Sequence, residues 1–105
     1  MENNVITKEY LVECFMDAVD TDKWTPVEEL VTEMLAKEGY GGEIQFSLEL
    51  EDMVVYGDKD NVRYTAKLDF DLVVRTFLET SARYTAEMCA NYFLNNKEIY
   101  STLDD

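Results

Sequence analysis

The sequence predicts an α+β fold in which helices cover one face of a long antiparallel β-hairpin. Apolar and polar residues alternate over 43–56 and again over 62–74, which is the pattern of two half-buried strands. The segment 57–61 between them is rich in residue types that favour turns. On both sides of the hairpin the apolar residues recur at helical spacing instead. We therefore expect the order α-α-β-β-α, with a short strand or docked tail over 99–103.

Two helices are predicted ahead of the hairpin. The first begins at the cap residue Thr7 and ends near Val19. The second begins at Thr25, which is followed by proline at the first helical position and by glutamate three residues after the cap. It ends at Gly39, a residue type that terminates helices. The apolar stripe that should bury the first helix consists of Leu11, Cys14, Phe15 and Ala18.

The hairpin has a predicted register. A loop of five residues, 57–61, would pair Tyr56 with Val62 and Leu48 with Phe70, and Leu50 would face Leu68. The apolar side chains of both strands would then share one face, and a shift of one residue would break that agreement. The opposite face should contact water, and it carries Glu43, Gln45, Glu49, Glu51, Lys67, Asp69 and Asp71.

A third helix is predicted from Ala82 to about Asn95, capped by Thr80 and Ser81, while 75–79 either extends the second strand or bends away. One stripe of this helix should face the core: Ala82, Ala86, Cys89 and Phe93. A second stripe at spacings of four residues consists of Tyr84, Met88 and Tyr92. In so small a domain one side of the helix should reach the surface. Tyr and Met are typical of interfaces, so the second stripe is a candidate dimer interface.

The composition limits the classes of function. At 105 residues we expect one domain over 1–105, with loose ends at 1–6 and 104–105. The 23 acidic residues outnumber the 9 basic ones, which gives a formal net charge of −14, and residues 1–60 carry −12 of it. Such a charge repels nucleic acid and anionic membranes and attracts basic proteins. Solubility is the simplest explanation of acidity, but the cost of self-repulsion at this density favours a use for the charge.

The same sequence predicts the compartment. It has two cysteines, too few for a disulfide framework, and no signal peptide precedes the first helix. No apolar run approaches the ~20 residues of a membrane span. We therefore expect a cytoplasmic protein with two buried thiols.

Catalysis is not expected. The chain has no histidine, which removes Ser-His and Cys-His pairs and imidazole metal ligands. The segment 58–61 is similar to the start of a calcium loop, but the glycine and the closing glutamate of such a loop are missing, so a turn explains it better. We expect no cofactor and no metal site. A carboxylate-based, metal-dependent enzyme would require acids that converge in a pocket.

The sharpest feature is a line of four carboxylates on the first helix, opposite its apolar stripe: Glu9, Glu13, Asp17 and Asp20. Four residues of helix rise about 6 Å, which is comparable to the spacing of phosphates along one nucleic-acid strand. Such a line could occupy a Lys/Arg groove that normally holds a phosphate backbone. A solvated polar face is the alternative explanation. The wider predicted partner-binding set adds Glu29, Glu33, Glu49, Glu51, Asp69 and Asp71.

These observations predict a non-enzymatic acidic binding protein that occupies a basic, nucleic-acid-binding surface of a partner protein. In size, charge and lack of catalytic residues the chain resembles the small acidic inhibitors that phages encode against host defence, such as anti-CRISPR and anti-restriction proteins. This resemblance is one of general character, and it implies a host cytoplasm but no site residues. The alternative is a small dimeric structural or adaptor protein, joined through the tyrosine–methionine stripe or a hairpin edge, whose acidity serves solubility.

Overall fold

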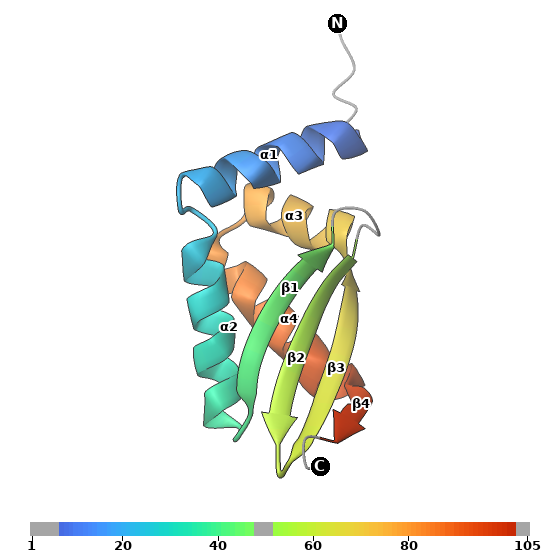
Figure 1. The fold of residues 1–105 in the computed structure, drawn as a ribbon. Coiled ribbons are helices and arrows are strands. Elements are labelled where there is room, and N and C mark those ends of the chain that lie inside the picture. Colours follow the sequence, from blue (N-terminus) through green and yellow to red (C-terminus); the bar gives the residue numbers. More distant parts are fainter. Residues whose placement is uncertain (1–6, 48–51, 103–105) are drawn as a thin grey trace, which may run out of the picture.

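In a computed structural model, residues 7–47 and 52–102 are described. The helices are Lys8–Asp20 (α1), Thr25–Lys37 (α2), Phe70–Glu79 (α3) and Ala82–Asn96 (α4). The strands are Gly41–Ser47 (β1), Asp52–Lys59 (β2), Val62–Asp69 (β3) and Glu98–Thr102 (β4). The predicted α+β class is confirmed, and the C-terminal segment forms a strand (Figure 1).

The strands form one antiparallel sheet in the order β1-β2-β3-β4. The helices α2 and α4 pack against one face of this sheet, and α1 and α3 lie together at one end of it (Figure 1). The hydrophobic core contains residues of all four helices and of β2 and β3. In the described part of the chain, the opposite face of the sheet carries no helix, as expected for a half-buried antiparallel sheet.

The turn between β2 and β3 contains two residues, Asp60 and Asn61, so the predicted five-residue loop is wrong. Both residues have positive φ, 55° and 64°, as in the tight hairpin turns whose twist matches that of the paired strands. Val62 therefore pairs with Lys59 and not with Tyr56, a shift of three residues along the strand. Because three is odd, the shift turns the other set of β2 side chains toward the helices.

The inward face of β2 accordingly differs from the prediction. Met53 and Val55 are fully buried, whereas Val54 and Tyr56 lie half-buried on the outer face. The predicted first strand over 43–56 is in fact two strands, β1 and β2, which pair with each other. Alternation alone could not decide which face of β2 is buried, since all four residues from Met53 to Tyr56 are apolar and both phases fit.

The end of the predicted hairpin is a helix. Phe70–Glu79 forms α3, so the second strand does not reach Val74. Phe70, Val73 and Val74 are buried at helical spacing, while Leu72 is 51% exposed. A strand would have buried Leu72 and exposed Val73. The predicted pairing of Phe70 with Leu48 is therefore wrong, and residues 48–51 lie outside the described range.

Most of the helix ends predicted from capping residues are confirmed. Thr7 and Ser81 each accept a hydrogen bond from the backbone N–H three residues later, at 3.2 and 3.1 Å, as predicted. Gly39, with φ of 90°, follows α2 as expected of a helix-ending glycine. Thr25 is not a cap but the first helical residue, because Trp24 already has helical dihedral angles and occupies the cap position.

Candidate functional site

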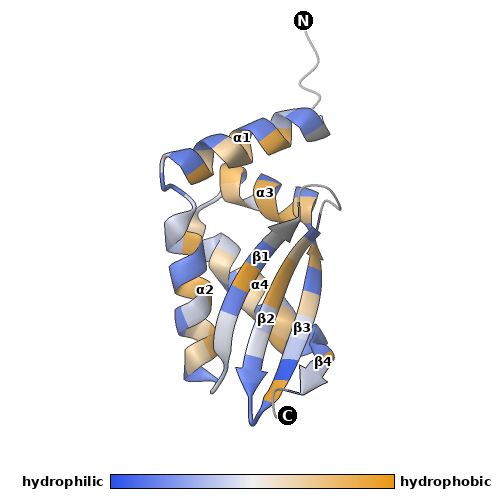
Figure 2. Cartoon of the chain, viewed as in Figure 1, coloured by the Kyte–Doolittle hydropathy of each residue, from blue (hydrophilic) through white to orange (hydrophobic). Residues whose placement is uncertain are grey.

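The four carboxylates of α1 lie along its solvent face. Glu9, Glu13, Asp17 and Asp20 are all exposed, whereas Leu11, Phe15 and Ala18 on the other side are buried. The last acid, Asp20, is eleven positions after the first, Glu9. This corresponds to roughly 16 Å along the helix axis. Figure 2 shows α1 with hydrophilic residues along its outer side and hydrophobic residues toward α3. We call these four residues the α1 ridge.

The apolar side of α1 is anchored by aromatic contacts. The ring of Phe15 meets the rings of Trp24 and Phe70 edge to face, with centroids 5.3 and 5.6 Å apart. Trp24 in turn meets Phe77 of α3 at 5.0 Å. These contacts hold α1 across the end of the molecule, next to α3 (Figure 1), and the ridge residues on its other side are exposed.

The second helix extends the acidic surface. Glu29 and Glu33 are exposed on the outer side of α2, one helical turn apart. Residues 7–38 contain nine acids against three bases, a net charge of −6. In the described part of the chain, no ridge carboxylate and neither α2 carboxylate is in an ion pair. Among the residues whose side chains are described, the negative charge of this end therefore has no compensating ion pair.

The sheet is different, because bases pair with two of its acids, Asp58 and Asp52. The guanidinium of Arg63 donates two hydrogen bonds to the carboxylate of Asp58, from Nε to Oδ1 at 2.8 Å and from Nη2 to Oδ2 at 3.0 Å. The hydrogen bonds from Arg63 lower the pKa of Asp58 below its ordinary value. Lys67 Nζ lies 3.6 Å from an oxygen of Asp52. The outer face of the sheet is thus mixed in charge rather than acidic.

Two of the predicted partner-binding acids, Asp69 and Asp71, do not join the α1 ridge. Two others, Glu49 and Glu51, lie outside the described residues. Asp69 ends β3 and caps α3, where its Oδ1 accepts a hydrogen bond from the Asp71 backbone N–H at 3.2 Å. Asp71 lies in α3 and not on the sheet, so its predicted place on the hairpin is wrong. Its Oδ1 atom is buried, and no described residue donates to it.

The predicted dimer stripe reaches the surface. Tyr84 and Tyr92 are 56% and 40% exposed, while Met88 is half-buried and packs against the core. The hydroxyl of Thr76 lies 3.8 Å from the Met88 sulfur. The stripe lines a shallow groove on α4 together with asparagine side chains, Asn91 among them.

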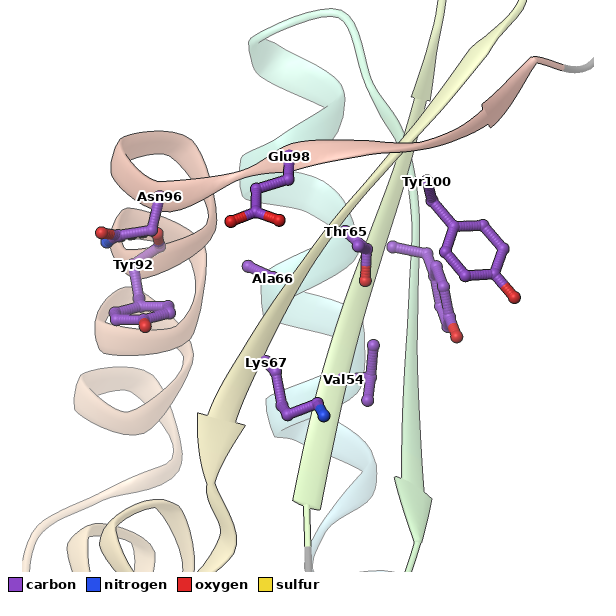
Figure 3. A pocket seen from close by; sticks show the side chains of 9 residues that line it. Val54, Thr65, Ala66, Lys67, Tyr92, Asn96, Glu98 and Tyr100 are labelled. Carbon is purple, nitrogen blue, oxygen red and sulfur yellow. Dashed lines mark hydrogen bonds between the residues drawn. The ribbon is translucent and has the colours of Figure 1, made fainter.

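A hollow of about 430 Å³ lies where the outer face of the sheet meets the end of α4 (Figure 3). Glu98 of β4 and Lys67 of β3 project into it from different sides, and Tyr92 and Asn96 line it from α4. Three residues on the sheet side complete the aromatic and apolar wall: Val54, Tyr56 and Tyr100. The rings of Tyr56 and Tyr100 meet edge to face at 5.3 Å.

The sequence did not predict this hollow, because it placed Val54 and Tyr56 on the buried face. The tyrosines at positions 56, 92 and 100 were the available signal, but their positions in the sequence do not show which rings come together.

The two cysteines differ in their surroundings. Burial raises the pKa of the Cys89 thiol to about 12, and both Cys89 and the half-buried Cys14 are free thiols. Residues 7–47 and 52–102 contain no group of three or more Cys, Asp or Glu side chains that could hold a metal ion. No helix in these ranges is both long enough and apolar enough to span a bilayer.

Comparisons with family models, with curated proteins and with solved structures find no match to this chain. Its function must therefore be argued from its own surface.

Proposed function

We propose that the protein is a non-enzymatic acidic binding protein whose α1 ridge and α2 carboxylates occupy a basic surface of a partner protein. The observation that supports this most directly is the contrast between the helices α1 and α2 and the sheet. The acids of the sheet at Asp52 and Asp58 are paired with bases, whereas the ridge carboxylates have no described cation next to them. Unpaired charge on a rigidly anchored helix is available to an external cation.

The partner surface is one that normally binds nucleic acid. Successive ridge carboxylates such as Glu9 and Glu13 are one helical turn apart, about 6 Å, and this spacing suits cations arranged to meet successive phosphates. A protein that neutralises those cations competes with nucleic acid for the same groove. A formal charge of −14 repels phosphate, so the contact is with the basic protein and not with nucleic acid itself.

This function requires no cofactor, metal or catalytic step. The compartment we propose is a reducing cytoplasm, which would be that of a host cell if the protein is phage-encoded. The class that fits is that of anti-defence inhibitors such as anti-CRISPR and anti-restriction proteins, on the grounds of charge and size alone.

The experiment compares two variants of equal charge. One neutralises the ridge by Glu9→Gln, Glu13→Gln, Asp17→Asn and Asp20→Asn. The control removes four exposed acids elsewhere by Asp60→Asn, Glu79→Gln, Glu87→Gln and Glu98→Gln. A partner captured from a host lysate is titrated with both variants over a series of salt concentrations. We expect the ridge variant alone to lose affinity, and its salt slope to fall by about one unit for each lost contact. Equal affinities and slopes for the two variants would mean that the ridge is only a solvated face.

A second candidate function, a homodimeric structural or adaptor protein, is favoured by one observation. Residues 82–102 contain two acids and two bases, a net charge of zero, and they expose apolar side chains. Ile99 and Tyr100 are 69% and 59% exposed on β4, an edge strand that has no lysine or proline to discourage pairing. Two chains of charge −14 would meet most easily through this neutral side, which also carries Tyr84 and Tyr92.

Salt separates the two functions because its effects have opposite signs. Salt weakens binding of the ridge to a basic partner, whereas it screens the repulsion between two acidic copies and strengthens a dimer. Sedimentation of the wild-type chain over a salt series measures the second effect directly. A monomer at high protein concentration and high salt would remove the dimer hypothesis.

A further inference from the structure

A second hollow, of about 290 Å³, opens between the end of α1 and the start of α2. Phe15 and Trp24 form its floor and are only 4% and 3% exposed. Met16 and Val19 form its α1 side, about one helical turn apart, and are 42% and 41% exposed. The floor and this wall are therefore apolar.

Two carboxylates also line this hollow, Asp22 from the turn between the helices and Glu28 from the first turn of α2. The chain folds back here because the backbone N–H groups of Lys23 and Trp24 both donate to the carbonyl oxygen of Ala18, at 2.7 and 3.3 Å. That turn brings acids from two elements to one apolar cavity. The residues that line the hollow come from the end of α1, the turn and the start of α2, and the two helices meet at a corner of the molecule there (Figure 1).

An apolar cavity bordered by carboxylates suits one kind of side chain. A neutral apolar group would fill the floor but would cover the carboxylates without pairing them, at a desolvation cost. An anion would be repelled. Partial burial raises the pKa of Glu28, because removal from water disfavours the charged form of its carboxyl group. A long basic side chain satisfies both requirements, because it has an apolar stem and a cationic end.

We propose, as an extension of the proposed function, that this hollow receives one arginine side chain of the basic partner. The aliphatic stem packs between Met16 and Val19 above the aromatic floor, and the guanidinium donates to Asp22 and Glu28. Arginine fits better than lysine because its planar fork of donors can bond two carboxylates from different elements at once. Arginine in a preformed pocket is also a frequent hot spot of binding energy.

Trp24 makes this inference directly measurable. It is the only tryptophan of the chain, so the intrinsic fluorescence reports on the floor of this hollow. The probe is a blocked Gly-Arg-Gly peptide, and the matched probe carries citrulline, which has nearly the shape of arginine without the charge. We expect a saturable change in Trp24 emission with the arginine peptide and none with the citrulline peptide. Equal responses to both peptides would overturn the assignment of the hollow to a cation.

Two pairs of variants test the same point with the partner protein. Met16→Lys places a cation at the wall of the hollow, and Ile99→Lys makes the same charge change on β4, at the far end of the molecule (Figure 1). Glu28→Gln and Glu98→Gln form a second pair that perturbs folding less. We expect Met16→Lys to weaken binding by about tenfold or more and Ile99→Lys to have only the small effect of one added charge. Glu28→Gln should weaken binding more than Glu98→Gln.

The outcomes distinguish failure of this inference from failure of the proposed function. Binding that depends on the α1 ridge but responds equally to Met16→Lys and Ile99→Lys would refute the arginine pocket and leave the function intact. Binding of the arginine peptide to Trp24 without any effect of ridge neutralisation on the partner would support the pocket and count against the function.

Discussion

Gly57 of β2 lies against the ring of Phe93 in α4, closely enough that the two positions cannot both carry a side chain. A Cβ atom at position 57 would stand 2.5 Å from Phe93 Cζ and 3.2 Å from Cδ1 of Tyr40. Phe93 is fully buried and meets Tyr40 edge to face at 5.4 Å, so its ring has little room to move. Because Gly57 has no side chain, Phe93 of α4 can lie directly against β2.

Gly57→Ala should therefore destabilise the protein by about 1–3 kcal/mol, the usual cost of inserting a methyl group into a filled core. The measurement is the midpoint of urea unfolding at constant slope. Gly41→Ala is the control, because a Cβ atom there meets no atom within 4 Å. That variant should be neutral or slightly more stable, and a comparable loss in both would contradict a steric origin.

The β2–β3 turn should respond to substitution at Asn61. Its φ of 64° is tolerated by asparagine, favoured by glycine and strongly disfavoured by β-branched residues. Asn61→Val should cost about 1–3 kcal/mol of folding free energy, and Asn61→Gly should retain or raise stability. Thermal melts of the two variants provide the test. If valine is tolerated as well as glycine, the two-residue turn is not the one formed in solution.

The pair of Asp58 and Arg63 should make stability depend on pH. Since the folded pKa of Asp58 is lowered, its contribution is fully present above the unfolded pKa of about 4 and is lost as the pH falls through the folded value. Asp58→Asn should lower the melting temperature at pH 7 and leave it nearly unchanged in strong acid. Asp60→Asn is the matched control, two residues away, exposed and in no described ion pair. A similar loss of melting temperature at pH 7 in both variants would show that the ion pair of Asp58 and Arg63 contributes nothing to stability.

The two thiols should differ strongly in reactivity. Cys89 is fully buried, and burial raises its pKa to about 12, whereas Cys14 is partly accessible. Iodoacetamide at mildly alkaline pH should alkylate Cys14 first and Cys89 more than about a hundredfold more slowly, because the thiolate is the reactive form. Mass spectrometry over time measures both rates, and added urea should equalise them. Comparable rates in the folded protein would place Cys89 outside the core.

Screening of the net charge should stabilise the chain. Repulsion among the acids of α1 and α2 acts over a Debye length of about 30 Å at 0.01 M salt but only about 10 Å at 0.1 M. The melting temperature near neutral pH should therefore rise with sodium chloride, and the rise should be smaller for the ridge-neutralised variant. A midpoint that stays flat or falls with salt would show that self-repulsion is not a significant cost.

Features that depend on neighbours in sequence could be predicted from the sequence alone. The caps at Thr7 and Ser81 and the end of α2 at Gly39 depend on backbone groups a few residues away. The burial of Leu11 and Phe15 and the exposure of the α1 ridge on the opposite side follow from the 3.6-residue period, which no distant contact needs to supply.

Only the tertiary structure decided which way β2 faces and where the second strand ends. All residues from Met53 to Tyr56 are apolar, so either phase of alternation would bury a suitable set. The choice depends on Gly57, which alone leaves room for Phe93 and must therefore face the helices. The residues after Asp69 likewise fit a strand or a helix, and the helix forms because its spacing packs Phe70 against Phe15 of α1. The hollow at Trp24 also depends on tertiary packing, since it exists only where α1 and α2 meet. Local periodicity determines which side of each element is apolar, and packing between distant elements selects which of these sides come together.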